Sequence, residues 1–201
     1  MFLHSVALAQ DERFFRDFLS KDLQIKRELK KEKVHFRSIS EFYDFDLNGD
    51  YRNESFIFEK KDGQGILYIY SYDRKKIFGY EFETLGKNAR PYRISVKNLS
   101  SKTKVFIVYY YEGNANYLKF KGSSRLYFLT IDNNDLNTLS MYKGPPVFEE
   151  FENFKKGHYH QRIYNVRAED FNTDGTKELS VEYGLTSRVY FYKSNGKWIT
   201  F

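Results

Sequence analysis

The chain has 201 residues, of which 41% are hydrophobic and 30% are charged, enough for one globular domain with its own core or for two small ones. Its net charge of +6 comes from basic residues spread along the chain, which favours some affinity for anionic partners but argues against a nucleic-acid-binding surface. The absence of cysteine excludes disulfides, thiolate zinc sites and cysteine nucleophiles, and the sequence has no run of about 18 apolar residues that would span a membrane.

The N-terminus carries a short signal-like pattern. Residues 1–9 end in Ala7-Leu8-Ala9, the small-x-small sequence after which signal peptidases cut, and Gln10 follows. The apolar stretch before this pattern is shorter than a full signal peptide and has no basic region ahead of it. We interpret residues 1–9 as the remnant of a signal peptide, with an ordinary disordered terminus as the alternative, and we expect the protein to be exported.

Residues 10–33 show helical rather than strand periodicity. Their apolar residues recur at spacings of three, four and seven: Phe15, Phe18, Leu19, Ile25 and Leu29. Ser20 is a suitable N-cap for a second helical segment. The pattern predicts one or two amphipathic helices. We interpret their lysine-rich face as a solvated surface, with contact to an acidic surface as the alternative.

From residue 34 onward the pattern is typical of β structure. Short runs of β-branched and aromatic residues are separated by turn signals, and the chain holds 18 Tyr and 20 Phe, which favour half-buried strands. Asp62-Gly63 and Asn195-Gly196 each predict a tight hairpin turn. The expected fold class is therefore mainly β, built from repeated four-stranded antiparallel sheets that resemble blades, with a short helical N-terminus.

An internal repeat divides this β region. Asp46 and Asp170 lie 124 residues apart, and each begins an acidic loop that leads into strands with similar turn spacing. Between them lies a third group of strands, whose loop "KNLSSKTK" lacks carboxylates. We expect about three units, at residues 34–84, 90–144 and 158–201, arranged like the blades of a small or incomplete β-propeller.

The two acidic loops place oxygen-bearing side chains at alternate positions. The predicted metal ligands are Asp46, Asn48, Asp50, Arg52 and Glu54 in one loop, and Asp170, Asn172, Asp174, Thr176 and Glu178 in the other. Positions one, three, five and nine offer side-chain oxygens and position seven offers a backbone carbonyl, a set that suits Ca²⁺. An EF-hand is excluded because position twelve is Ile57 or Val181 and strands follow. The alternative is a pair of acidic turns without metal, since Asp, Asn and Gly are common turn residues.

Residues 170–179, "DFNTDGTKEL", resemble the calcium loop of FG-GAP/VCBS-type repeats, the units of integrin-like β-propellers. Residues 46–55, "DLNGDYRNES", resemble it with two departures, Tyr51 in place of the usual glycine and Ser55 in place of the usual aliphatic residue. If position six requires positive φ, Tyr51 costs of order 1 kcal/mol or more, which makes residues 46–54 the weaker site. The resemblance implies a bacterial exported protein in which one or two calcium ions staple the blades together without taking part in catalysis.

Other candidate sites carry weaker signals. His158 and His160 would share one face of a strand and could bind a metal, but no third ligand is evident nearby. Glu149 and Glu150 would suit a glycosidase pair, although adjacent carboxylates usually point apart. The sequence contains none of the motifs of serine hydrolases, P-loops, dinucleotide sites or zinc proteases. Aromatic residues exposed on alternate positions of strands would favour carbohydrate binding.

We therefore expect a non-catalytic interaction or structural module, located in the periplasm or outside a bacterial cell as part of a protein assembly. A carbohydrate-binding module is the alternative, and a hydrolase is the third hypothesis. The expected partners are one or more proteins, in a homo- or hetero-assembly, because open sheet edges favour pairing with other chains. We expect no nucleic-acid partner and no transmembrane segment. Three arrangements of the sheets remain as alternatives: a closed ring, an open array, or an array that another protein completes.

Overall fold

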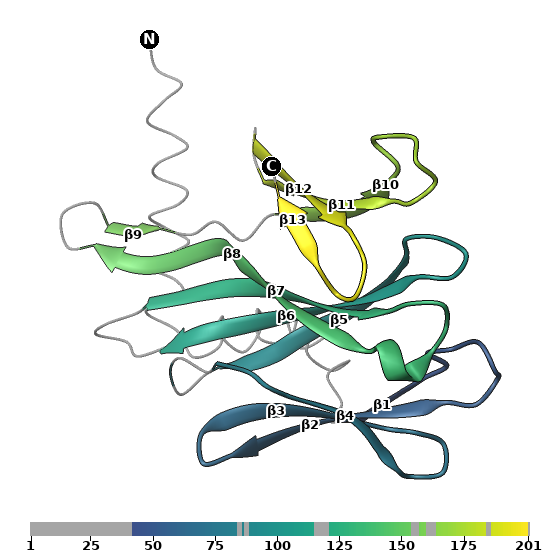
Figure 1. Ribbon diagram of the computed structural model, residues 1–201. Helices are drawn as coiled ribbons and strands as arrows, with labels where there is room; N and C mark the ends of the chain where they lie inside the picture. Colours follow the sequence, from purple (N-terminus) through teal and green to yellow (C-terminus); the bar gives the residue numbers. More distant parts are fainter. Residues whose placement is uncertain are drawn as a thin grey trace. The chain divides into compact units, whose positions relative to one another are not determined.

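The computed structural model describes residues 42–83, 86, 89–114, 121–153, 157–159, 164–183 and 186–200. This part of the chain contains thirteen β-strands in three antiparallel sheets, which confirms the expected mainly β fold class (Figure 1). The expected signal remnant at residues 1–9 and the expected helical segment at residues 10–33 lie outside the described residues. Within the described ranges, no helix is long and apolar enough to cross a membrane.

The first sheet is a four-stranded meander in the order β1-β2-β3-β4. Its strands are β1 (Phe42–Phe45), β2 (Glu54–Lys61), β3 (Gln64–Tyr70) and β4 (Lys76–Glu81). The tight turn predicted between β2 and β3 is confirmed, because Lys61 pairs with Gln64 across a two-residue loop. Both loop residues have positive φ, 52° at Asp62 and 85° at Gly63, as a turn that matches the twist of its flanking strands requires.

The middle sheet has five strands, one more than the expected four, in the order β5-β6-β7-β8-β9. They are β5 (Arg90–Asn98), β6 (Lys104–Asn114), β7 (Lys121–Ile131), β8 (Ser140–Asn153) and β9 (Gly157–Tyr159), with a 3₁₀ turn (Leu136–Thr138) before β8. The middle sheet therefore continues past residue 144, where the sequence predicted the end of the middle unit.

A bulge around the proline pair Pro145-Pro146 explains this difference. The pairing of β7 with β8 shifts register on both sides of Arg125, which lies opposite Pro146. Proline cannot donate an N–H to the ladder, so bulges are among the few places in a sheet that tolerate it. The bulge lets β8 continue where two prolines would be expected to end a strand, and the second half of β8 then pairs with β9.

The third sheet repeats the four-stranded meander, in the order β10-β11-β12-β13. Its strands are β10 (Asn165–Glu169), β11 (Glu178–Tyr183), β12 (Thr186–Tyr192) and β13 (Trp198–Thr200). Asn195 and Gly196 adopt the expected positive φ, 50° and 72°. They are the two central residues of a tight turn, in which the N–H of Lys197 donates to the carbonyl of Ser194 at 3.1 Å, so the predicted turn is confirmed.

The middle sheet is buried on both faces, because its strands alternate between two hydrophobic cores. On β6, Phe106 and Val108 belong to the core shared with the first sheet. Val105 and Ile107 point the other way and belong to the core shared with the third sheet. Ring contacts cross these interfaces, for example at 5.6 Å between the ring centroids of Phe45 and Phe106. The first and third sheets therefore pack on opposite faces of the middle sheet.

Two polar residues of the third sheet occupy positions equivalent to apolar core residues of the first sheet. Phe56 and Phe58 pack in the core between the first and middle sheets, and the residues 124 positions later are Ser180 and Glu182. These two lie on the face of β11 opposite to that of Leu179 and Val181, where Ser180 is buried at 2% exposure. On that face Arg167 pairs with Glu182 at 3.3 Å. The two copies of the repeat therefore differ in polarity at these positions.

Candidate metal-binding loops

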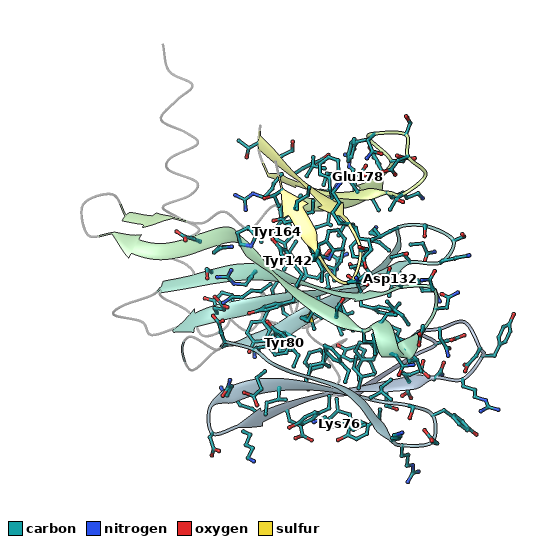
Figure 2. The ribbon with its side chains drawn as sticks, viewed as in Figure 1. Lys76, Tyr80, Asp132, Tyr142, Tyr164 and Glu178 are labelled. Carbon is teal, nitrogen blue, oxygen red and sulfur yellow. The ribbon has the colours of Figure 1, made fainter. Side chains whose placement is uncertain are left out.

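The two acidic loops occupy equivalent places in the first and third sheets. The first acidic loop, residues 46–53, joins β1 to β2, and the second acidic loop, residues 170–177, joins β10 to β11. In each case position nine is the first residue of the strand that follows, Glu54 in β2 and Glu178 in β11. Figure 2 labels Glu178 beside its loop. The structure thus places the ten predicted residues in two matched groups.

The second acidic loop is closed by its own side chains. The Asp170 carboxylate accepts hydrogen bonds from the backbone N–H groups of Asp174 and Gly175, at 3.2 and 3.0 Å. The Asn172 side-chain oxygen also accepts from the N–H of Asp174, at 3.0 Å, and its amide group donates to the Asp174 carboxylate at 2.9 Å. The other oxygen of Asp174 accepts from the N–H of Thr176 at 2.8 Å. These bonds fix alternate side chains toward the inside of the loop.

The first acidic loop contains the equivalent hydrogen bonds and one more. The Asp46 carboxylate accepts from the N–H groups of Asp50 and Tyr51, at 3.2 and 3.0 Å, and an additional bond comes from a glycine N–H at position four. Asn48 bonds to Asp50 through both its oxygen and its amide group. Asp50 in turn accepts from the N–H of Arg52 at 2.8 Å. The repeat found in the sequence is therefore also a repeat of local geometry.

The glutamate at position nine ties each loop to its sheet. Glu54 and Glu178 are only 1% and 2% exposed. Glu54 accepts from the N–H of Leu47 at 2.9 Å, and Glu178 accepts from the N–H of Phe171 at 2.8 Å. Each glutamate therefore connects position nine to position two, so that the start of the loop and the start of the next strand are held together.

The fold lowers the pKa of some carboxyl groups in these loops and raises the pKa of another. The hydrogen bond from the Asn48 side chain, followed by a backbone N–H, holds the pKa of Asp50 below its ordinary value. The N–H of Thr176, followed by a side-chain amide, lowers the pKa of Asp174 in the same way. Burial raises the pKa of Glu54, and the two aspartates of its own loop raise it further. Negative charge is thus gathered around a buried carboxyl group.

Each acidic loop contains two left-handed positions and supplies glycine at only one of them. In the first loop the φ values are 79° at Gly49 and 66° at Tyr51. In the second loop they are 59° at Thr173 and 84° at Gly175. The suspected requirement for positive φ at position six is confirmed. Position four carries the same requirement, and the alignment of Gly49 with Thr173 is the sequence signal for it.

The donor set of these loops fits calcium in its chemistry. All predicted donors are oxygens, and an ionised carboxylate offers about four lone-pair sites, so accepting loop N–H groups leaves further capacity for a hard cation. The side-chain oxygens bond to the loop's own amides as described above. Within the ranges that the structure describes, no group of three or more His, Cys, Asp or Glu side chains is gathered closely enough to hold a metal ion.

Both acidic loops are attached to the middle sheet. The Lys104 ammonium group, at the start of β6, donates to the carbonyl of Leu47 at 3.1 Å. The N–H of Lys177 donates to the carbonyl of Leu99 at 2.8 Å. Leu99 begins the middle sheet's own loop, which lacks carboxylates and is instead closed by the Ser100 hydroxyl group. Ordering either acidic loop therefore restrains the packing of its sheet on the middle sheet.

The structure adds little support for the other candidate sites. Glu149 lies exposed on β8, while the side chains of Glu150 and His158, and all of His160, lie outside the described residues. Most described aromatic residues pack in the two cores and not on strand surfaces. The exposed large rings lie in loops instead, at Tyr51, Tyr72 and Phe171. Two of them, Tyr51 and Phe171, lie within the acidic loops that the sequence predicted.

Comparisons with known proteins add no relative to this description. No protein-family model matches the chain, and no significant match is found to a curated protein or to a solved structure. The resemblance to FG-GAP/VCBS-type calcium loops therefore rests on the two acidic loops and the strands that follow them.

Proposed function

We propose that this chain is a non-catalytic interaction or structural module whose acidic loops are stabilised by calcium, and that it acts in the periplasm or outside a bacterial cell. The observation that carries this proposal is the shared geometry of the two loops. Two segments 124 residues apart use the same donor residues, the same hydrogen bonds and a buried glutamate at the same position. An acidic turn that arose by chance has no reason to recur with this detail.

Calcium is the ion that this donor set suits best. It takes six to eight oxygen ligands from carboxylates, amide oxygens, backbone carbonyls and water. Positions one, three, five and nine would supply side-chain oxygens, and position seven, at Arg52 and Thr176, would supply a backbone carbonyl. With three carboxylates in each loop, the expected affinity lies in the weak extracellular range, at a Kd of about 10⁻⁴–10⁻³ M. That range suits an exported protein.

A bound ion would act on stability and not on a reaction. It would neutralise the negative charge around the buried glutamate and hold positions one to nine in one arrangement. Because Leu47 and Lys177 contact the middle sheet, the same restraint would reach the interfaces between sheets. The three described sheets also keep edge strands, such as β4 and β13, and open edges favour assembly with other proteins.

Calcium should raise the melting temperature, and Asp174→Asn should reduce that rise. At about 10 mM calcium, a Kd of about 10⁻⁴–10⁻³ M adds roughly 1.4–2.7 kcal/mol to the free energy of unfolding, because the ion binds only the folded chain. For a domain of this size that corresponds to a rise of roughly 3–10 °C. Thermal melts in calcium and in chelator measure the effect.

The matched control is Asp62→Asn, which changes the same residue type in the turn between β2 and β3. Asn tolerates the left-handed φ of 52° at this position, so the control should keep the full calcium response. Identical melts with calcium and chelator for the unaltered chain would show that both loops are acidic turns without a metal, and the calcium part of the proposal would be withdrawn.

A further inference from the structure

The chain contains two Asn-Gly pairs, and the structure places them in different surroundings. Asn48-Gly49 belongs to the first acidic loop, and Asn195-Gly196 forms the centre of the turn between β12 and β13. Asparagine loses its side-chain amide most easily before glycine, because a backbone nitrogen without a neighbouring side chain can reach the asparagine side-chain carbon. The two pairs therefore expose the same reactive sequence to two local structures.

The groups that would react at Asn48 are held by hydrogen bonds. The Asn48 side-chain oxygen accepts from the N–H of Asp50 at 3.2 Å, and its amide nitrogen donates to the Asp50 carboxylate at 3.1 Å. The N–H of Gly49, whose nitrogen would attack, donates to the Asp46 carboxylate at 2.6 Å. This bond is charge-assisted and therefore stronger than a neutral one. Attack at Asn48 requires the loop to open first.

The side chain of Asn195 is exposed and unrestrained. Among the residues that the structure describes, it forms no hydrogen bond. The N–H of Gly196 donates to the Tyr192 hydroxyl group at 3.2 Å, a neutral acceptor whose own proton is donated to the Asp132 carboxylate. The Asn195 amide is thus free to move, and the attacking nitrogen is held by a weaker bond than that of Gly49.

The turn that contains Asn195 packs against the middle sheet. A Cβ atom at Gly196 would lie 2.2 Å from the hydroxyl oxygen of Ser140, the first residue of β8. Trp198 follows the turn and belongs to the core between the middle and third sheets, where its indole N–H donates to Thr130 on β7 at 3.3 Å. A change in the backbone of this turn would therefore act on the contact between the two sheets.

We propose that Asn195 is a site of spontaneous deamidation in the folded protein, and that the modified turn loosens the third sheet from the middle sheet. The Gly196 nitrogen bonds to the Asn195 side-chain carbon as the bond to the amide nitrogen breaks. The amide group and the Gly196 proton leave as ammonia, and water then opens the succinimide ring to aspartate or isoaspartate. This inference goes beyond the proposed function and does not depend on calcium.

Isoaspartate is the product that should disturb the turn most. It carries the main chain through the side-chain carbon, so the backbone gains a methylene group between Ser194 and Gly196. The hydrogen bond from the N–H of Lys197 to the carbonyl of Ser194, at 3.1 Å, closes the unmodified turn and depends on its length. A longer backbone also displaces Gly196 from its close contact with Ser140.

The first experiment compares the two pairs within one protein. The unaltered chain is aged for weeks in a mildly alkaline buffer with chelator, either folded or in denaturing urea, and peptide mapping by mass spectrometry measures conversion at Asn48 and Asn195. In the folded chain we expect Asn195 to convert about tenfold faster than Asn48 or more, because Asn48 reacts only when its loop opens. In urea the two pairs should convert at similar rates.

A matched variant tests whether the loop protects Asn48. Asp50→Ala removes the carboxylate that holds the Asn48 amide nitrogen, so it should raise the rate of conversion at Asn48 in the folded chain and leave the rate at Asn195 unchanged. An unchanged rate at Asn48 in this variant would contradict the protection that the inference assigns to the loop.

The second experiment measures the effect on the fold. After ageing, the unaltered chain should melt at a lower temperature than a fresh sample, as followed by the fluorescence of Trp198, the only tryptophan of the chain. The control Asn195→Gly has no amide at this position and tolerates the left-handed φ of 50°, so it should melt alike before and after ageing.

Several results would overturn the inference. Equal conversion of the two pairs in the folded chain, faster conversion at Asn48, or no conversion at Asn195 would remove the proposed site. A preference for Asn195 that persists in urea would place its cause in the neighbouring sequence and not in the fold. An aged chain that has lost the Asn195 amide and still melts like a fresh one would remove the effect on the third sheet.

Discussion

Replacing Phe128 by alanine is expected to lower the free energy of unfolding by about 3–5 kcal/mol. Phe128 lies on β7 and is fully buried in the core between the middle and third sheets. Its ring contacts Tyr190 and Trp198, with centroids 5.0 and 4.8 Å away, and stacks on Tyr142 at 5.8 Å. Because three rings from two sheets surround it, the cavity left by alanine cannot collapse easily.

Urea unfolding followed by tryptophan fluorescence measures this change, because Trp198 is the only tryptophan of the chain and contacts Phe128 directly. The control Val96→Ala removes an apolar group from an exposed position on β5 and should cost less than about 1 kcal/mol. A loss below about 1 kcal/mol for Phe128→Ala would mean that the third sheet does not pack on the middle sheet in solution as described.

Removing Arg125 should be similarly damaging, because it leaves the buried Glu112 carboxylate without its counter-charge. The Arg125 guanidinium donates to Glu112 at 3.3 Å and to the carbonyl of Gly144 at 2.6 Å. Breaking a buried pair by deleting one partner typically costs about 3–5 kcal/mol. Tyr110 and Tyr127 line the same site, and the pKa of each is raised by burial and then by the charge of Glu112.

A double-mutant cycle separates this ion pair from simple loss of packing. Arg125→Ala alone should be much less stable than the unaltered chain in urea, whereas Arg125→Ala/Glu112→Gln should recover a large part of the loss, because the neutral amide needs no counter-charge. If the two substitutions add without coupling, the destabilisation comes from lost packing of the arginine stem and not from an unpaired carboxylate.

The acidic loops and much of the β fold could be predicted because their signals are local. Alternate oxygen-bearing residues at positions 46–50 and 170–174 specify side chains that turn inward, and the structure shows those hydrogen bonds. Asp62-Gly63 likewise specifies its own turn through two left-handed residues. In both cases the residues that carry the pattern also form the contacts.

The remaining features depend on contacts between distant segments. From the sequence alone, Pro146 predicts the end of a strand. Its pairing with Arg125 on β7 shows that it lies at a bulge, where a proline is tolerated. Phe106 and Ile107 are neighbouring apolar residues of one strand, yet they pack in different cores, which the sequence pattern alone does not assign. Ser180 is polar at the position equivalent to Phe56, yet it is only 2% exposed, and the repeat alignment does not predict this burial.

Equilibrium dialysis of calcium-free protein against increasing calcium measures whether the acidic loops bind the ion. We expect saturable binding with a Kd of about 10⁻⁴–10⁻³ M, loss of the tighter component in Asp174→Asn, and no change in Asp62→Asn. An absence of bound calcium up to about 10 mM, or equal binding by Asp174→Asn and the unaltered chain, would contradict it.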